Sequence, residues 1–248
     1  MIIDFHVHGK ITNTFPFDEE KFLLTIKEAR EYGLDSLAIT EHCGANNFLE
    51  GYMFLNSNYN SIKDYYDIDG FKVFYGMEVT TKQDLDILFI GKTELVLELR
   101  EKINSNLNND QYIDINELFK LDISDDLLII LAHPYRDHIQ FPKLEKHIIN
   151  RLDALELNSK DIYKTGYEEM KEKISKLAGE FRLPITAGTD THYFIQISTA
   201  KNIFNGNCNT IKEIKEEIKQ RNYNIEFSKE LEARVKKAII NKKLICNK

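Results

Sequence analysis

Histidines and carboxylates end short apolar runs at several places along this chain. Five of its seven histidines lie at or just after such a run, and a further run, from Phe71 to Met77, leads to Glu78. The five histidines are His6, His8, His42, His133 and His192. Imidazole nitrogens and carboxylate oxygens are common ligands of catalytic metal ions, and ions held close together activate water for hydrolysis. The pattern therefore predicts a multinuclear metal site and metal-assisted hydrolysis.

Two pairs of these residues have the spacing of neighbours on one side of an extended chain. His6 and His8 are two residues apart, so on a strand both side chains point to the same face. Asp190 and His192 have the same spacing. Glu78 ends a run that reads as a buried strand, where a carboxylate is costly unless it is paired or bound to metal. Its two oxygens can bridge two ions.

The elements that must position these residues alternate along the chain. The expected strands are Met1–His6, Leu34–Thr40, Phe71–Thr80, Leu85–Gly91, Leu127–Ala132, Ala154–Leu157 and Pro184–Ala187. The expected helices are Asp18–Tyr32, Thr93–Ile103, Ile115–Leu121, Tyr167–Phe181, Ile211–Asn222 and Glu230–Ile240. Over 248 residues this alternation predicts one α/β domain with a parallel sheet closed as a barrel. In such barrels functional groups gather at the carboxyl ends of the strands, where these histidines and carboxylates are expected.

Charge and composition argue against several classes of protein. A net charge of −7 disfavours a general nucleic-acid or membrane-surface binder. Cys43, Cys208 and Cys246 are too few and too scattered for a disulfide framework. The N-terminus lacks the basic and apolar segments of a signal peptide, and no apolar run approaches the roughly 18–20 residues of a membrane span. We expect a cytoplasmic protein with no membrane or nucleic-acid partner, and the oligomeric state is left open.

The motifs resemble those of the polymerase-and-histidinol-phosphatase (PHP) superfamily. Its members carry H-x-H after the first strand, T-[DE]-H after the second, G-x-E after the third, then H-P and finally D-x-H. All five motifs occur here in that order, from His6 to His192. The resemblance implies a single domain over residues 1–248, a distorted (β/α)7 TIM-like barrel with helices of residues 211–248 packed on it. It places a metal site at the C-terminal ends of the strands.

The resemblance also implies two or three divalent ions and the residues that bind them. The first ion would be held by His6, His8, Glu78 and Asp190. Glu78 would bridge to a second ion that His133 also binds, and His42 and His192 would hold a third. Zinc, manganese and iron all suit such a set of ligands.

The chain departs from the PHP pattern at two places. Many relatives have a histidine on the fourth strand, whereas this chain has Asp86, which is either a further ligand or an outward-facing strand residue. Relatives often supply another ligand in the loop after H-x-H, but the loop Gly9–Thr14 has no strong ligand here. The third ion is therefore the least supported. Glu41 is either exposed or orients a metal-bound imidazole.

The expected reaction is hydrolysis of a phosphate ester by a metal-bound hydroxide, without a side-chain nucleophile. No G-x-S-x-G sequence or Cys/His pair suggests covalent catalysis. For binding the phosphoryl group, Arg136 is the first candidate and Lys10 the second, because both follow predicted ligands closely. A small phosphorylated metabolite is expected as substrate, histidinol phosphate being one example. His138 and His147 are expected at the surface, with His138 a candidate for the site entrance.

Two other kinds of function remain open. A TatD-like deoxyribonuclease or an amidohydrolase also begins with H-x-H on a barrel strand, but the T-E-H and D-x-H motifs favour the PHP assignment. The acidic net charge also disfavours a nuclease. A non-catalytic PHP module that binds metal for stability or regulation is the alternative from another class. Retention of nearly all the ligand positions argues against that reading.

Overall fold

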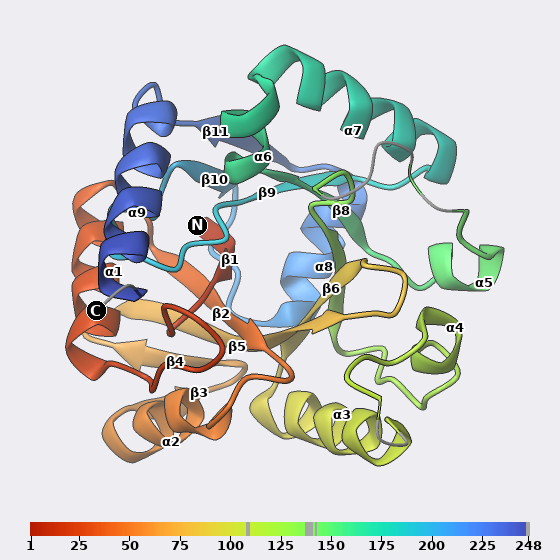
Figure 1. Cartoon of the computed structure of the whole chain (residues 1–248), viewed down its shortest axis with the longest axis horizontal. Coiled ribbons are helices and arrows are strands. Elements are labelled where there is room, and N and C mark those ends of the chain that lie inside the picture. Colours follow the sequence, from red (N-terminus) through yellow and green to blue (C-terminus); the bar gives the residue numbers. More distant parts are fainter. Residues whose placement is uncertain (108–109, 137–140, 142, 247–248) are drawn as a thin grey trace.

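One strongly curved sheet forms the centre of the molecule and nearly closes into a barrel (Figure 1). The structure is a computed structural model and describes residues 1–107, 110–136, 141 and 143–246. The sheet has the strand order β11-β10-β1-β2-β5-β6-β7-β8-β9, with β3 and β4 attached to β5. The strands are β1 (Ile2–Val7), β2 (Ser36–His42), β3 (Asn60–Ile62), β4 (Tyr65–Ile68), β5 (Phe71–Thr80), β6 (Asp86–Gly91), β7 (Leu128–Ala132), β8 (Ala154–Asn158), β9 (Ile185–Gly188), β10 (Ala200–Phe204) and β11 (Tyr223–Phe227).

Most helices surround the outer face of this sheet, as Figure 1 shows. They are α1 (Glu19–Glu31), α2 (Leu49–Asn58), α3 (Thr93–Asn106), α4 (Ile115–Leu118), α5 (Lys146–Ile149), α6 (Ser159–Thr165), α7 (Tyr167–Phe181), α8 (Ile211–Gln220) and α9 (Leu231–Cys246), with a 3-10 turn at Phe194–Gln196. Sequence signals explain several ends: Asp18 caps α1 by accepting from the Lys21 amide, and Thr210 and Glu213 form a capping box at α8. The distorted TIM-like α/β barrel expected from the sequence is confirmed.

Two apolar cores follow from the alternation of side chains along the strands. The outer core lies between the sheet and the surrounding helices and includes Val73 and Tyr75 of β5. The inner core lies inside the barrel and includes Phe74 of the same strand. Helix α8 contributes Ile211, Ile214 and Ile218 to this inner core, at the spacing of one helical face. This helix therefore closes one end of the barrel, and the other end is left for polar side chains.

The sheet is not parallel throughout, and the expectation of a parallel sheet is wrong for β6. This strand pairs antiparallel with both β5 and β7, in the register Thr80↔Asp86 and Asp86↔Ala132. Only the short segment Thr81–Leu85 joins β5 to β6, whereas a parallel crossover needs roughly a dozen residues or more. The reversal brings the first residue of β6, Asp86, to the end of the barrel where β5 and β7 finish.

Several elements carry too weak a pattern to be expected from the sequence. They are α2, the β3–β4 hairpin, α5, α6, β10 and β11. Predicted helix and strand bounds elsewhere agree with the structure within a few residues, except that α9 extends to Cys246. His138 lies outside the described residues, and His147 is exposed in α5. No helix in the described ranges is long and apolar enough to cross a membrane.

Side-chain hydrogen bonds close the seam where β9 approaches β1. A parallel bridge joins Val7 to Thr191, and the His8 amide donates to the Thr191 carbonyl at 2.8 Å. Asn202 of β10 lies fully buried beneath this bridge. Its amide nitrogen donates to the carbonyls of Ile3 (3.1 Å) and Ala187 (2.7 Å), and its oxygen accepts from the Ala187 amide (2.8 Å). One asparagine side chain thus joins the backbones of β1 and β9 at this seam.

Replacing Asn202 by alanine is expected to lower the free energy of unfolding by about 2–4 kcal/mol, because buried backbone groups lose their partners. Urea unfolding monitored by circular dichroism measures the change. Asn224→Ala is the control, since Asn224 is exposed on β11, and its effect is expected within about 0.5 kcal/mol. Equal stability of Asn202→Ala and wild type would contradict the bridging role.

Candidate metal centre

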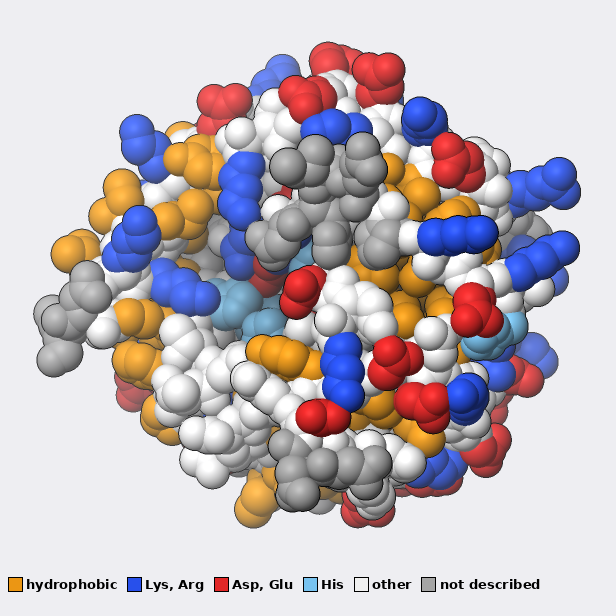
Figure 2. All heavy atoms as spheres, turned by 45° about the vertical axis from the view of Figure 1, so that its right-hand side comes forward, with side chains coloured by type: hydrophobic (Ala, Val, Ile, Leu, Met, Phe, Trp, Pro, Cys, Tyr) orange, Lys and Arg blue, Asp and Glu red, His pale blue; other side chains and the backbone are white. Residues whose placement is uncertain are grey.

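All the predicted ligands lie at the same end of the barrel. Strands β1, β2, β5, β7 and β9 finish there, and β6 begins there. The residues brought together are His6, His8, His42, Glu78, Asp86, His133, Asp190 and His192. Figure 2 shows histidine side chains grouped in a hollow of the surface, with acidic and basic side chains beside them. Their role as ligands stays a prediction, which the geometry below supports.

The residues predicted to hold the first ion surround one small space. The Nε2 atoms of His6 and His8 are 3.2 Å apart. Each lies close to a different oxygen of Glu78, at 3.3 Å for His6 and 3.4 Å for His8. Oδ1 of Asp190 completes the group at 3.3 Å from His8 Nε2 and 3.9 Å from His6 Nε2. The donor atoms that face each other are those that a single ion would bind.

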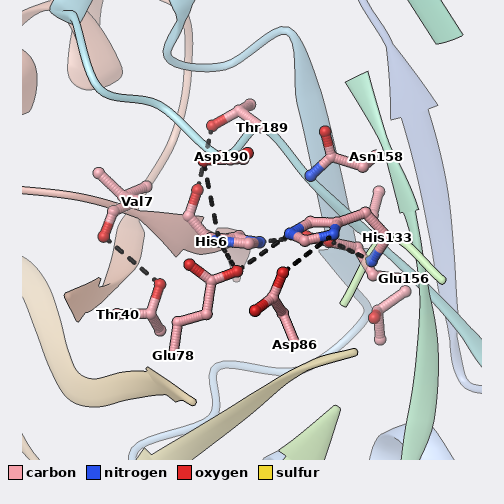
Figure 3. Close-up of polar contacts among 12 residues, drawn as sticks. His6, Val7, Thr40, Glu78, Asp86, His133, Glu156, Asn158, Thr189 and Asp190 are labelled. Carbon is pink, nitrogen blue, oxygen red and sulfur yellow. Dashed lines mark hydrogen bonds and ion pairs between the residues drawn. The ribbon is translucent and has the colours of Figure 1, made fainter. Parts of the chain in front are cut away.

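Glu78 also faces the second predicted group. His133 Nε2 lies 3.0 Å from Glu78 Oε1, as Figure 3 shows. Asp86 Oδ2 lies 3.8 Å from the other ring nitrogen of His133, Nδ1. Burial and the nearby negative charge of Glu78 raise the pKa of Asp86. The antiparallel direction of β6 thus brings Asp86 within reach of the cluster, where its carboxylate can either complete a site with Glu78 and His133 or orient the His133 ring.

The two residues predicted to hold the third ion, His42 and His192, both stack on His8 of the first group. Ring centroids of His8 and His192 are 4.0 Å apart, and those of His8 and His42 are 4.5 Å apart. The three residues offer one ligand atom each within 4.8 Å of one another. Burial, with His8 and Lys160 nearby, lowers the pKa of His192 well below its usual value, so the ring keeps a lone pair for a metal. His42 Nδ1 lies 2.9 Å from Glu78 Oε2.

The electrostatics of the cluster fit divalent cations. Glu78 Oε2 and Asp190 Oδ1 are buried and accept no hydrogen bond within the part of the chain that the structure describes. Imidazole nitrogens nevertheless lie 2.9 Å from the first oxygen (His42) and 3.1 Å from the second (His192). An imidazole lone pair and a carboxylate oxygen repel each other at this distance unless a proton or cation lies between them. The imidazole and carboxylate donors also suit zinc, manganese or iron.

The pKa shifts of His6 and Glu78 also fit a site for divalent cations. Burial lowers the pKa of His6, but Glu156, Glu78 and Asp190 outweigh it and raise that pKa well above its usual value. Burial opposes ionisation of Glu78, yet His6 and His42 hold its pKa well below the usual range. A divalent ion would supply the positive charge that the proton on His6 otherwise provides.

Two predicted ligands have strained backbones. His133 has φ +26° and Asp190 has φ +52°, a region that residues with a side chain rarely adopt. Such strain persists only where surrounding contacts enforce it, and it is concentrated at functional sites. Here the His133 amide donates to Glu156 at 3.0 Å, and the segment before Asp190 is held by Asp4.

Glu156 of β8 was not expected from the sequence. It is buried, accepts from the His133 amide and lies 2.9 Å from His6 Nδ1, so it directs His6 Nε2 toward the cluster. The neighbouring Gly188 makes room for it, because a Cβ there would lie 1.8 Å from Glu156 Oε1. A carboxylate inside the apolar run Ala154–Leu157 is the signal that could have found it, as it did for Glu78.

Asp4 is a second residue that sequence reasoning missed. It is fully buried and accepts from the Thr189 hydroxyl at 2.5 Å and from the amides of Thr189 (3.2 Å) and His6 (3.1 Å). Burial raises its pKa to about 7. These bonds tie β1 to the residue that precedes Asp190. The available signal is its period-two spacing with His6 and His8.

The cations predicted to bind phosphate are engaged inside the protein. Arg136 donates from Nε to Asp161 at 3.0 Å, from Nη2 to Asn158 at 2.9 Å and from Nη1 to Asp190 Oδ2. Lys10 is buried, and its ammonium donates to a backbone carbonyl. A direct role of either in binding substrate stays a prediction.

Lys160, which the sequence reasoning did not select, contacts two of the predicted ligands. Its Nζ is 2.9 Å from Asp190 Oδ2 and 3.3 Å from His192 Nδ1. Burial lowers its pKa to about 8, although Asp190 opposes the shift.

Glu41 is buried, and of its two open roles the structure favours the orienting one. Its Oε1 lies 3.4 Å from His8 Nδ1, and its Oε2 accepts from the Lys10 amide at 3.1 Å. The carboxylate therefore faces the ring nitrogen of His8 that points away from Glu78 and Asp190. Glu41 and Glu156 contact the two histidines of the H-x-H motif in the same way.

Comparisons with known proteins find likeness in structure and not in sequence. No protein-family model and no curated protein sequence matches the chain. The structure of PsfC from Pseudomonas syringae PB-5123 superposes with a TM-score of 0.77 at 16% identity, over 98% of each chain.

A second similar structure is the lesion-specific endonuclease PfuEndoQ from Pyrococcus furiosus, with a TM-score of 0.59 at 18% identity. That match covers 91% of this chain and 58% of the endonuclease, so this chain corresponds to little more than half of that protein. At the level of the fold, these likenesses are consistent with the PHP superfamily that the motifs resemble.

Proposed function

We propose that this protein is a metal-dependent phosphoesterase that hydrolyses a small phosphorylated metabolite. The observation that supports it most is the position of Glu78, one buried carboxylate in contact with imidazoles of all three predicted ion sites. His6 and His133 face its Oε1 at 3.3 and 3.0 Å, and His42 faces its Oε2 at 2.9 Å. Glu78 would therefore be a shared ligand of adjacent ions.

Residues behind the predicted ligands would hold those ligands in place during such a reaction. Divalent ions, when bound, polarise phosphoryl oxygens and lower the pKa of water. Glu41 and Glu156 orient His8 and His6, and the Asp4–Thr189 bonds hold the segment that carries Asp190. Cys43 beside His42 is a poor nucleophile, because burial raises the pKa of its thiol to about 11. No covalent intermediate is required.

A cavity of about 320 Å³ adjoins His42 and Glu78 and is suited to the organic part of the substrate. Its lining combines neutral polar and apolar side chains: Asn13, Asn104, Gln111 and Tyr112 with Ile103, Leu107 and Ile113. Among the described residues that line it, none is a lysine or arginine. The volume and lining favour a small, neutral, polar leaving group such as a polyol. Histidinol phosphate is a candidate through the family resemblance alone, because histidinol carries a protonated amino group and is not neutral.

A nuclease is the second candidate, because the endonuclease from Pyrococcus furiosus shares the fold. The net charge of −7 disfavours binding a polyanionic strand. The two functions are separated by offering phosphomonoesters, single-stranded DNA and duplex DNA with an abasic lesion to the same metal-loaded protein.

Purified protein is expected to contain two or three zinc, manganese or iron ions and to hydrolyse phosphomonoesters. Asp190→Ala should lose metal and reduce kcat/KM by at least about 100-fold, because one ligand and the partner of Lys160 and Arg136 disappear together. Elemental analysis and a phosphatase screen measure both effects. Asp125→Ala, at an exposed position remote from the cluster, is the control. Undiminished activity of Asp190→Ala would rule out the site, and an inactive metal-loaded wild type would rule out the function.

Glu156→Gln keeps the volume of the side chain but weakens its hold on His6. Metal affinity should fall about 10–100-fold, as is typical when the partner of a ligating histidine is changed. Competition with a chromogenic chelator gives the affinity. Glu226→Gln on the exposed edge strand β11 serves as the matched control. Wild-type affinity in Glu156→Gln would mean that this carboxylate does not orient His6.

Metal affinity should also depend on pH in a defined direction. His6 has a raised pKa in the metal-free protein, so a metal ion must displace its proton. Affinity is therefore expected to rise with pH until the pH passes the raised pKa of His6 and to be lost as the pH falls, and in Glu156→Gln the rise should begin at lower pH. Chelator competition across this range tests the direction, and pH-independent affinity would contradict it.

A further inference from the structure

The amide oxygen of Asn158 accepts two hydrogen bonds, whereas its amide nitrogen has no acceptor among the described residues. The residue ends β8, is 1% exposed and caps α6. Its Oδ1 accepts from Arg136 Nη2 and from the Lys160 amide, both at 2.9 Å. Its Nδ2 is buried and has no hydrogen-bond partner among the described residues. A buried donor without an acceptor is destabilising, and a bound ligand that accepts a hydrogen bond from this nitrogen would remove the cost.

The orientation of the amide follows from its neighbours. Both groups that contact Oδ1 are obligate donors, an arginine N–H and a backbone N–H. Exchanging oxygen and nitrogen would set the NH2 group against two donors, so the hydrogen-bond network assigns Oδ1 to that side. Nδ2 must then point away from Arg136. Figure 3 shows it on the side of Asn158 that faces His133 and Asp190.

Lys160 supplies a second donor at the same edge of the metal cluster. Its ammonium, two residues after Asn158, contacts Asp190 Oδ2 at 2.9 Å and His192 Nδ1 at 3.3 Å. An ammonium has three N–H groups, so one remains after these two contacts, which are those that Lys160 Nζ makes within the described part of the chain. Asp190 uses Oδ2 for Lys160 and Arg136 and leaves Oδ1 toward His8. Asp190 thus faces the cations with one oxygen and the predicted ligands His8 and His192 with the other.

The free groups at this edge are donors, which selects an anionic ligand. We infer that Asn158 Nδ2 and Lys160 Nζ form a binding site for the non-bridging oxygens of a tetrahedral oxyanion, beside the metal centre. Hydrogen bonds from such donors to phosphoryl oxygens are charge-assisted and strong. The assignment of this oxyanion as the phosphoryl group of the substrate rests on the proposed function, whereas anion binding itself does not.

Arg136 then has a different role from the one the sequence suggested. Its guanidinium holds Asn158 and Asp190 at once and is itself held by Asp161. Its charge is balanced by the two carboxylates, and each of its three nitrogens donates a hydrogen bond within the protein. Arg136 is a positioning residue, and Asn158 and Lys160 are the residues that contact the anion.

Binding of inorganic phosphate to the metal-loaded protein, measured by isothermal titration calorimetry, tests this site. Asn158→Asp keeps an oxygen toward Arg136 and the Lys160 amide but replaces the donor by an acceptor. Asn158→Ser removes the donor without adding charge. Both should weaken phosphate binding at least about 10-fold and lower kcat/KM about 100-fold or more, as the loss of a preorganised donor does at an oxyanion site. Metal content should stay close to wild type in both variants, and the thermal midpoint should do so in Asn158→Asp, which keeps the acceptor for Arg136.

Lys160→Met should also weaken phosphate binding at least about 10-fold. Lys164→Met, on the same helix but exposed, is the control for the loss of one positive charge and should bind phosphate as wild type does. If wild type binds no phosphate, or if the two Asn158 variants bind it as tightly as wild type, the site is refuted. An adventitious ion only, held by the metals alone, would give that second result.

The outcomes separate this site from the proposed function. Loss of phosphate binding in the Asn158 variants, together with a wild type that hydrolyses no phosphoester, would support the anion site and overturn the function. Hydrolysis by wild type with unchanged kcat/KM in the Asn158 variants would support the function and overturn the anion site.

Discussion

The burial of Glu78 and Asp190 among imidazoles is the constraint on which the rest of this end of the barrel depends. Both carboxylates are almost inaccessible to water, and isolated buried charges are strongly unfavourable. They are tolerated because His6, His8, His42 and other donors surround them with positive or polarisable groups. The arrangement is therefore built for cations, and the barrel is the scaffold that brings strand ends together to form it.

A layer of residues behind the ligands gives the cluster its geometry. Glu41 and Glu156 face the outer nitrogens of His8 and His6, and Asp4 fixes the segment before Asp190. Such outer contacts select the tautomer and rotation of a ligating ring. The strained φ values at His133 and Asp190 are held by the same contacts. The positions of the predicted ligand atoms are thus fixed by the folding of the barrel core and by the contacts that join β9 to β1.

One end of the barrel is apolar and the other is polar. Helix α8 fills one end with isoleucines, so that end needs no polar groups. The other end is lined by strand termini, whose loops are free to carry polar side chains. The short hairpin between β5 and β6 adds Asp86 to this end by reversing one strand. A local change of chain direction thereby changes the set of donors available to the predicted ions.

Much of this molecule is determined by local sequence. Apolar runs and helical periodicity predicted most strands and helices, and period-two spacing placed His6 beside His8. The tight connection at Thr81–Leu85 also contained the information that β6 is antiparallel, although the overall βα alternation obscured it. What only the tertiary structure decided are contacts between distant segments. Glu156 contacts His6 although 150 positions separate them in the sequence. Arg136 and the Lys160 amide occupy the oxygen of Asn158, and its nitrogen has no acceptor among the described residues. Such pairings depend on how the strands close into a barrel, and spacing along the chain does not encode that closure.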